Sequence, residues 1–477
     1  MTATDLCYLS AAQALDLFRK KKLSPVELME ALIRRAEEVN PGINAFADTY
    51  FEEAMHKART AGGLYAKKGS RLRPLEGIPV AVKDAQRVAG KRTTYGSLLF
   101  KDNVSDQSDP MIERLEEAGA IIHARTTTPE FCLSGTCHTR MWGVTRNPFN
   151  PKFGPGGSSG GSGAALAAGM TTLATGTDIG GSIRIPASAC GVVGYKPPHG
   201  RNPDGPPACF DSYNHCGPMT RTTADAALIQ NIVSGVHPND HDSLRDRVVI
   251  PDELEPVRDF RIAYSLDLGY MNLDTDVLRN TLTALDVFRA LGCSVDEVEL
   301  GWTLDCERAA AHWYNSMHFG RQTIWHAQHD AADMCDYSVK FARHCEAHTT
   351  LDDMARSWEQ LHKMYQTFGP LMQKYDIFIC PTNGLPAVAA EHDPWDQDFR
   401  INGVKVDPEN GWILTYQFNM LHNCPVMSLP SGRAKSGVPT GIQIIGPTFD
   451  DVRVFRAAHA YEHAAPQLFI SAKNHPL

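Results

Sequence analysis

Two segments rich in glycine and serine lie close together near the middle of the chain and hold the residues best suited to chemistry. The first covers residues 156–163 (GGSSGGSG) and the second residues 176–184 (GTDIGGSIR). Glycine permits sharp turns and lets backbone N–H groups approach a ligand closely. Consecutive N–H groups at residues 179–182 could therefore surround a developing negative charge, as an oxyanion hole does, with the Ser182 hydroxyl beside the same carbonyl. Helix- and core-forming residues flank both segments, which favours an acyl-transfer site over a flexible linker.

Two other kinds of site also use glycine-rich motifs. A phosphate-binding loop ends in Lys-Ser or Lys-Thr, whereas the first segment ends at Gly163 and continues with two alanines. The Gly-x-Ser-x-Gly elbow of α/β-hydrolases matches at Ser158, but that elbow must follow a buried strand. Here residues 147–155 (NPFNPKFGP) come first, and their prolines exclude a central strand. The elbow also requires an Asp and a His that nothing in the sequence singles out.

A lysine ends a short apolar run upstream of both serine segments. Residues 75–82 (LEGIPVAV) are predicted to form a buried strand that ends at Lys83 and Asp84. A serine hydroxyl is a poor nucleophile until a base removes its proton. Lysine can be that base when burial holds it neutral. An isolated lysine at a strand end is usually solvated, but the two serine motifs favour the buried base.

These segments together resemble the amidase signature family of serine hydrolases. Residues 156–186, which end in GTDIGGSIRIP, are similar to the serine motifs of that family, and residues 77–84 (GIPVAVKD) to its lysine strand. Residues 191–196 (GVVGYK), 217–222 (GPMTRT) and 441–443 (GIQ) also fit. The resemblance therefore extends over most of the chain.

The resemblance implies a Ser–Ser–Lys triad. Ser182 would be the nucleophile that forms an acyl-enzyme. Ser158, expected to follow a cis peptide bond, would connect Ser182 to Lys83 and pass a proton to the leaving nitrogen, with Lys83 as the final base. The oxyanion hole would be formed by four backbone N–H groups, those of Ile179, Gly180, Gly181 and Ser182.

The resemblance also assigns residues around the triad. Backbone near Cys132 and Ser134 would line the acyl pocket, and Thr177 would contact the substrate. Asp178 would steady the second segment together with Thr177, and Arg184 would pair within it. Residues 202–215 (NPDGPPACFDSYNH) lie in a region that departs from the family pattern. They are interpreted either as a lid or wall over the pocket or as an ordinary surface loop.

The order of the predicted elements indicates an α/β fold. Residues 261–265, 277–291 and 294–300 are expected to form a βαβ unit with parallel strands. The resemblance implies one amidase domain over residues 1–477, with a large mixed central β-sheet covered by helices on both faces. Within it we expect an N-terminal helical pair at about residues 9–40, the signature core at about 75–235 and a helical elaboration at about 301–375. The second N-terminal helix is predicted to begin at the capping box of residues 24–27 and to stop at residues 40–42.

Composition excludes several classes of function. A net charge of −9 argues against nucleic-acid binding, whose footprint is basic. We expect no signal peptide and no membrane partner, and the 12 scattered cysteines indicate reduced thiols in a cytoplasmic protein. The triad supplies nucleophile and base, so no metal and no other cofactor is expected.

The predicted function is hydrolysis of the C–N bond of small amides, including aryl amides. Carbamates and esters are alternative substrates of the same site. The other enzymatic alternative is a glutamine-hydrolysing subunit of a transamidating complex, which would need a glutamine pocket and a partner enzyme. An inactive binding protein is disfavoured because all three triad residues are present. The remaining partner prediction is a homodimer.

Overall fold

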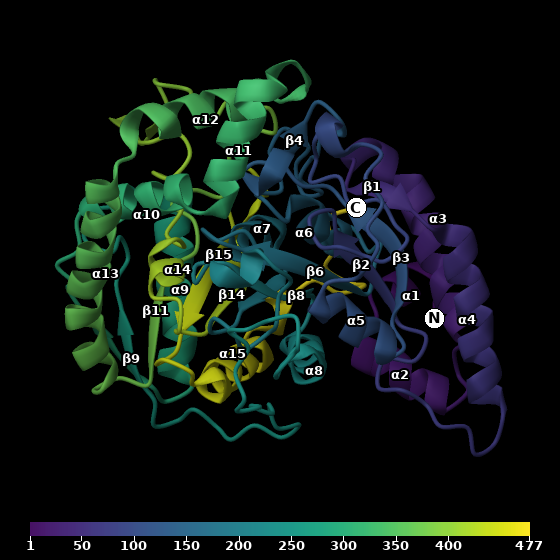
Figure 1. The fold of residues 1–477 in the computed structure, drawn as a ribbon. Coiled ribbons are helices and arrows are strands. Elements are labelled where there is room, and N and C mark those ends of the chain that lie inside the picture. The colour runs from purple at the N-terminus through teal and green to yellow at the C-terminus, as the bar shows by residue number, and fades with distance from the viewer.

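A mixed β-sheet of eleven strands crosses the described part of the molecule (Figure 1). The computed structural model describes residues 1–477, apart from the side chains of residues 318 and 319. The strands lie in the order β1-β3-β2-β6-β8-β7-β14-β15-β11-β9-β10. Their bounds are β1 (Phe46–Thr49), β2 (Pro79–Lys83), β3 (Ile121–Thr126), β6 (Leu173–Asp178), β7 (Val193–Lys196), β8 (His215–Thr220), β9 (Arg261–Tyr264), β10 (Ser294–Glu297), β11 (Ile377–Pro381), β14 (Val426–Arg433) and β15 (Pro439–Ile445).

The sheet has parallel strand pairs towards each of its two ends. β2 pairs in parallel with β3 and β6, and β9 with β10 and β11, whereas the other neighbouring pairs are antiparallel. The predicted βαβ unit is confirmed, because β9 and β10 are parallel and a helix connects them. Two short hairpins lie outside the sheet, β4 (His138–Thr139) with β5 (Gly143–Val144) and β12 (Arg400–Ile401) with β13 (Val404–Lys405).

Helices surround this sheet and form the outer parts of the molecule (Figure 1). The α-helices are α1 (Ala3–Cys7), α2 (Ala11–Arg19), α3 (Pro25–Ile43), α4 (Phe51–Ala66), α5 (Pro110–Glu117), α6 (Gly160–Ala167), α7 (Arg184–Cys190), α8 (Thr223–Val233), α9 (Thr275–Ala290), α10 (Asp305–Ser316), α11 (His318–His329), α12 (Asp336–His348), α13 (Leu351–Met372), α14 (Gln417–Met420) and α15 (Asp451–Ala464). Short 3₁₀ turns occupy Leu98–Phe100, Glu130–Cys132, Ala208–Phe210, Ala331–Asp333 and Pro466–Leu468.

Strand β11 shows how both faces of the sheet are buried. Successive side chains of a strand point to opposite faces. Ile377 and Ile379 belong to a hydrophobic cluster that includes Leu285 of α9. Phe378 points the other way and contacts the ring of Phe368 on α13, with the centroids 5.6 Å apart. Helices therefore cover both faces, which confirms the predicted α/β class and mixed sheet.

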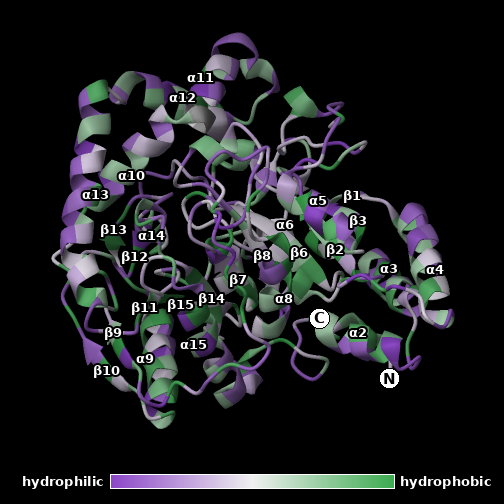
Figure 2. Ribbon diagram, turned by 60° about the horizontal axis from the view of Figure 1, so that its bottom comes forward, coloured by the Kyte–Doolittle hydropathy of each residue, from purple (hydrophilic) through white to green (hydrophobic). Residues whose placement is uncertain are grey.

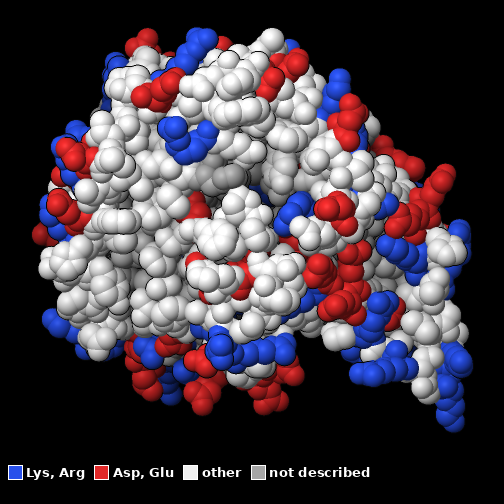
Figure 3. Space-filling model, in the orientation of Figure 1, with Lys and Arg blue, Asp and Glu red and all other residues white. Residues whose placement is uncertain are grey.

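The peripheral helices have one apolar and one polar side. Along α13, Ser357, Met364, Phe368 and Met372 are buried, and Figure 2 shows this helix as alternating purple and green turns. Its apolar side packs inward, as expected of an amphipathic helix. Charged side chains lie mostly around the rim of the face seen in Figure 3, whereas its centre is largely uncharged. No helix among the described residues combines the length and the apolar content needed to cross a bilayer.

The N-terminal helical pair is present as α2 and α3, but α3 is longer than predicted. Ser24 forms the predicted capping box, with proline in the first turn. The predicted stop at residues 40–42 is wrong, because α3 continues to Ile43 with Pro41 inside its last turn. Pro41 lies so close to the helix end that its missing N–H removes little of the helix's stability. Asn44, with φ of 53°, turns the chain out of the helix instead.

The lysine strand is shorter than the sequence indicated. The prediction began it at residue 75, whereas β2 begins at Pro79. Gly77 has φ of +84°, a conformation that glycine adopts without strain, and the N–H of Ile78 bonds to the carbonyl of Leu75 at 3.0 Å. The first residues of the predicted strand therefore form a turn that leads into β2.

Candidate active site

Lys83 lies at the end of β2, in the interior of the sheet between β3 and β6. Its side chain is fully buried, and its Nζ is hydrogen-bonded to Ser158 Oγ at 2.6 Å and to Thr177 Oγ1 at 2.7 Å. Burial lowers the pKa of Lys83, although nearby Cys132, Cys137 and Asp178 act in the opposite direction. The apolar strand thus favours the neutral amine that a lysine base needs.

Ser158 begins the loop that leads into α6. The Gly157–Ser158 peptide bond is cis, as the family resemblance implied, and the serine is fully buried. Gly157 is packed so tightly that a Cβ atom there would overlap the Thr136 carbonyl oxygen. Glycine is therefore the residue that fits beside Ser158.

The two serine segments contact each other directly. The N–H of Ser159 donates to the carbonyl of Ser182 at 3.1 Å, and Ser159 Oγ bonds to both the N–H and the carbonyl of Thr177 at 3.3 Å. Among the described residues, no hydrogen bond joins the side chains of Ser158 and Ser182. Both serines nevertheless line the same cavity.

Ser182 follows β6 and precedes α7, with 7% of its surface exposed. In the described part of the chain, the amide groups of residues 179–182 donate no hydrogen bond to a protein group, so they are free to bind an anion. Gly181 has φ of +127°, and a Cβ there would overlap Thr415 Oγ1. Thr415 Oγ1 in turn donates to the Gly180 carbonyl at 2.6 Å. The structure thus brings the four predicted oxyanion-hole residues into one tight turn.

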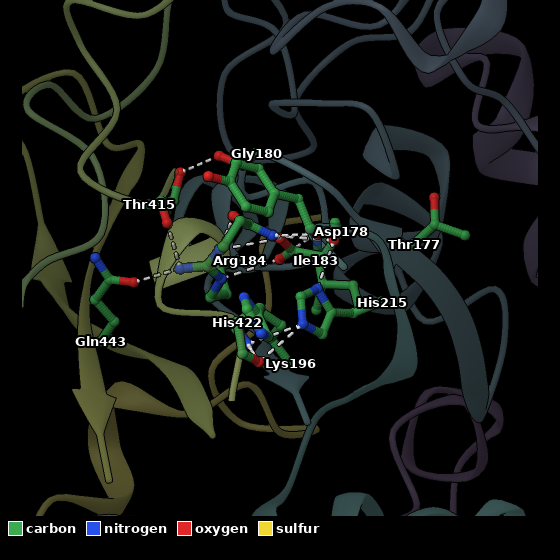
Figure 4. A network of polar contacts seen from close by, with 12 residues as sticks. Thr177, Asp178, Gly180, Ile183, Arg184, Lys196, His215, Thr415, His422 and Gln443 are labelled. Carbon is green, nitrogen blue, oxygen red and sulfur yellow. Dashed lines mark hydrogen bonds and ion pairs between the residues drawn. The ribbon is translucent and has the colours of Figure 1, made fainter. Parts of the chain in front are cut away.

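A buried ion pair supports this turn from behind (Figure 4). Arg184 donates through Nε and Nη2 to the carboxylate of Asp178, at 3.0 and 2.9 Å, and both side chains are inaccessible to solvent. Burial opposes ionisation of Asp178, but the guanidinium outweighs it and holds the pKa of that carboxyl below its ordinary value. Arg184 Nη1 also donates to Gln443 Oε1 at 2.8 Å and to the Thr415 carbonyl at 2.9 Å. Residues from the end of the chain thus fix the loop that carries Ser182.

Lys196 and His215 extend this support to strands β7 and β8. Lys196 Nζ donates to the carbonyls of Pro197 and Cys424, at 3.1 and 2.9 Å, and lies 3.3 Å from His215 Nε2 (Figure 4). His215 Nδ1 lies 3.1 Å from the Asp178 carbonyl oxygen. Burial, with the nearby charge of Arg184, lowers the pKa of Lys196 to about 7. Lys196 thus supports the Ser182 loop from the interior of the fold and does not line the cavity.

The serines open onto a cavity of about 780 Å³. Thr177, Ile179 and Gly180 lie in its wall, as do Cys132 and Ser134, whereas Lys83 and Gly181 do not line it. Part of the loop of residues 202–215 also lines the cavity, so of its two interpretations the structure favours the wall. The aromatic residues of the wall are Tyr95, Phe100, Phe131, Tyr314, Tyr337, Phe341 and Trp395.

Acidic side chains outnumber basic ones in the described wall. The carboxylates belong to Asp106, Asp109, Asp204, Asp211, Asp407 and Glu409, whereas Arg87 is the single arginine and no lysine is present. Arg87 Nε donates to Asp109 at 2.7 Å, so its charge is neutralised within the protein. No group of three His, Cys, Asp or Glu side chains with the geometry of a metal site occurs among the described residues. This environment suits uncharged or cationic ligands better than anionic ones.

Several residues of the site were not found from the sequence. Tyr314 and Glu409 line the cavity, and Thr415 braces Gly180. Each lies more than 100 positions after the serine motifs and within locally ordinary helical or loop sequence. Only a three-dimensional arrangement could have identified them.

Comparison with known proteins gives a consistent result. The family model described as Amidase matches residues 27–455. An acylamidase of Rhodococcus erythropolis is 32% identical over 98% of this chain and 97% of the relative. A glutamyl-tRNA(Gln) amidotransferase subunit of Geobacter metallireducens is also 32% identical, over 94% of this chain and 96% of that protein. The crystal structure of a bacterial aryl acylamidase of the amidase signature family is similar with a TM-score of 0.90 and 29% identity, covering 98% of this chain and 99% of that one.

Proposed function

We propose a Ser182 acyl-enzyme mechanism for this chain, which belongs to the amidase signature family of amide C–N hydrolases. The observation that carries the proposal is the buried Lys83 amine, 2.6 Å from Ser158 Oγ and beside the loop that holds Ser182. Burial removes the solvation that keeps lysine protonated. The chain thus has a base connected to a serine at the wall of a large cavity.

In the acylation step, Ser182 Oγ attacks the amide carbonyl carbon and gives its proton to Ser158, whose own proton passes to the neutral Lys83. The carbonyl oxygen becomes negatively charged and is held by the free amides of residues 179–182. Ser158 then donates a proton to the leaving nitrogen, with Lys83 restoring it, and the C–N bond breaks. The amine departs and the acyl group remains on Ser182.

Deacylation repeats the relay with water as the nucleophile. Water attacks the ester carbonyl and its proton passes through Ser158 to Lys83. The bond to Ser182 Oγ then breaks, and the serine recovers a proton by the same route. The products are a carboxylic acid and the free enzyme, with no net change in protons on Lys83.

We propose uncharged aryl amides as the preferred substrates. Seven aromatic side chains in the described wall offer stacking surfaces for an aryl group. The similar aryl acylamidase structure supports the same substrate class. Carbamates and esters present a comparable carbonyl to Ser182 and are proposed as alternative substrates of this site.

Glutamine hydrolysis for a transamidating complex is a second candidate, because the amidotransferase relative has the same 32% identity to this chain as the acylamidase. Recognition of glutamine requires a cation for its α-carboxylate. In the described cavity wall Arg87 is the single arginine, and it is paired with Asp109. This charge distribution favours the aryl amidase proposal. The homodimer and the cytoplasmic location remain predictions.

The test combines a substrate panel with active-site labelling. Purified protein is assayed on an acetanilide, a phenyl carbamate, a 4-nitrophenyl ester and glutamine, and we expect the anilide to be hydrolysed and glutamine to be inert. A serine-directed fluorophosphonate should leave its adduct on Ser182, as read by peptide mass mapping, and Ser182→Ala should remove both label and activity. An adduct on Ser158 that persists in Ser182→Ala would overturn the assignment. Release of ammonia from glutamine and copurifying partner proteins would favour the second candidate.

A further inference from the structure

The hydroxyl group of Tyr314 lies against the loop of residues 179–182, whose amides form the proposed oxyanion hole. Tyr314 is near the C-terminal end of α10, and its side chain lines the cavity together with Gly180. A Cβ atom placed on Gly180 would lie 2.8 Å from the Tyr314 oxygen. The phenol therefore packs directly on the backbone whose neighbouring amides are free.

This hydroxyl is buried and has no hydrogen-bond partner among the described residues. Nearly all buried polar groups of folded proteins are paired, because an unpaired one forfeits its bonds to water. Burial, together with the negative charge of nearby groups such as Asp178, raises the pKa of Tyr314 well above its ordinary value. The group is thus a neutral phenol whose donor is unused.

Neighbouring contacts hold Tyr314 in this position. The adjacent Trp313 stacks on the ring of Tyr213, with centroids 4.2 Å apart, and donates through Nε1 to Asp211 at 2.9 Å. The end of α10 is therefore anchored by the residue that precedes Tyr314. A donor fixed before the substrate arrives needs little reorganisation when it binds charge.

We propose that the Tyr314 hydroxyl donates a hydrogen bond to the carbonyl oxygen of the substrate, beside the amides of residues 179–182. The inference rests on the proposed amide hydrolysis and adds a side-chain donor to its oxyanion hole. The carbonyl oxygen gains negative charge as Ser182 attacks, and hydrogen bonds to a charged acceptor are stronger. The contact therefore contributes more in the transition state than in the bound substrate.

The experiment compares Tyr314→Phe with wild type on an anilide and on the thioanilide of the same acyl group. The substitution removes only the hydroxyl, and sulfur is a weak acceptor. We expect kcat/KM on the anilide to fall about tenfold, the scale of one hydrogen bond to a developing charge, and kcat/KM on the thioanilide to fall less than about threefold. Tyr50→Phe is the matched control. It also removes a buried hydroxyl with no partner among the described residues, but one outside the cavity wall, so kcat/KM should be unchanged on both substrates.

Each outcome decides the inference. A smaller loss on the thioanilide than on the anilide supports it. Equal losses on both substrates, or no loss in a variant with wild-type melting temperature, overturn it. Ser182→Ala is measured in parallel: if Ser182→Ala keeps its activity, the proposed Ser182 acyl-enzyme mechanism itself fails. If Ser182→Ala is inactive while Tyr314→Phe loses the same factor in kcat/KM on the anilide and the thioanilide, only the proposed role of Tyr314 fails.

Discussion

At the scale of single residues, the proposed chemistry depends on one buried amine. Lys83 has no ion-pair partner within 4 Å among the described residues, and its Nζ bonds are to the hydroxyls of Ser158 and Thr177. Hydroxyl partners allow the neutral form, whereas a carboxylate would keep the amine charged. The strand that buries Lys83 therefore does more than position it, because it also sets the protonation state.

Replacement of Lys83 should abolish most amide turnover. Lys83→Ala removes the base, and we expect a loss of at least about 10²-fold in kcat/KM. Lys83→Arg should not rescue activity, because the pKa of arginine is above about 12 and the side chain therefore cannot act as a neutral base. Wild-type kcat/KM should rise with pH and level off below the usual lysine range, since burial lowers the pKa of Lys83. Near-normal activity of Lys83→Arg would show that only a positive charge is needed.

Ser158→Ala should affect amides more than activated esters. An amine cannot leave without a proton, whereas a 4-nitrophenolate can, so removal of Ser158 should slow an anilide by at least about 10² and the nitrophenyl ester of the same acyl group by less. Ser162→Ala serves as the control, because Ser162 lies on α6, directly after the loop of Ser158, and bonds to Thr126 and Thr175 outside the cavity. Its amide-to-ester rate ratio should match wild type. An equal loss on both substrates in Ser158→Ala would contradict the role in leaving-group protonation.

Residue types predicted part of the site and missed another part for a physical reason. Lys83 and the two serines could be identified because the apolar run that ends at Lys83 and the glycine-rich serine motifs together resemble the amidase signature family, whereas the run alone would leave Lys83 as a solvated strand end. Tyr314 could not, since α10 is an ordinary amphipathic helix in which any one tyrosine looks like a packing residue. Its unpaired hydroxyl becomes visible only against Gly180, which is distant in sequence.

At the scale of elements, the site is a junction of two loops that the sheet brings together. One loop leads into α6 and carries Ser158, and the other connects β6 to α7 and carries Ser182. Bonds from Ser159 to Thr177 and Ser182 join them. Glycines at this junction are needed because backbone from other segments occupies the space where side chains would be.

Gly181→Ala tests how closely that junction is packed. The new Cβ would overlap Thr415 and the φ of +127° would be strained, so we expect a loss of about 2–4 kcal/mol in the free energy of unfolding. Amide hydrolysis should fall as well, because the oxyanion amides must shift. Gly437→Ala is the matched control, with φ of +83° but open space around the position, and should cost about 1 kcal/mol with full activity retained. Chemical denaturation of both variants measures the free energy of unfolding, and anilide assays measure their rate of amide hydrolysis.

The sequence predicted helices and strands correctly where the periodicity of hydrophobic residues distinguishes the two. The residues at which elements begin and end were predicted less accurately. The β9–α9–β10 unit followed from its alternation of patterns. The end of α3 was missed because a proline in a last turn is tolerated when the next residues, here with Asn44 in the left-handed region, complete the turn. The pairing of Arg184 with Asn419 and Gln443 depends on sheet order, which local patterns do not contain.

At the scale of the whole molecule, segments from the end of the chain complete a site begun near its start. Glu409 reaches the loop of Ser134 and accepts hydrogen bonds from the Gly135 N–H and from Ser134 Oγ, the latter at 3.0 Å. Burial raises the pKa of Glu409 to about 7. The Glu409 carboxyl, which makes this contact between distant segments, therefore changes its protonation state near neutral pH.

Stability should respond to this carboxyl in a defined direction. Between about pH 4.5 and 7 the unfolded chain releases the Glu409 proton while the folded chain keeps it, so stability falls as pH rises through that window. In Glu409→Gln the amide oxygen can still accept from the Gly135 N–H, and the amide NH2 can donate to Ser134 Oγ in place of accepting from it, so both contacts remain and the side chain does not titrate. We expect the melting temperature of Glu409→Gln to exceed that of wild type at pH 8 and to approach it at pH 5. An equal difference between the two proteins at both pH values would contradict a raised pKa in the folded state.

The anchoring of Arg184 also has a consequence for biosynthesis. Ribosomes make Ser182, the proposed nucleophile, long before Thr415, Asn419 and Gln443, the residues that hold its loop in shape. A growing polypeptide therefore contains every triad residue while still lacking a formed catalytic centre. Hydrolytic competence arises only when translation is nearly finished, so unfinished chains and premature-stop products are expected to be harmless to the amides around them.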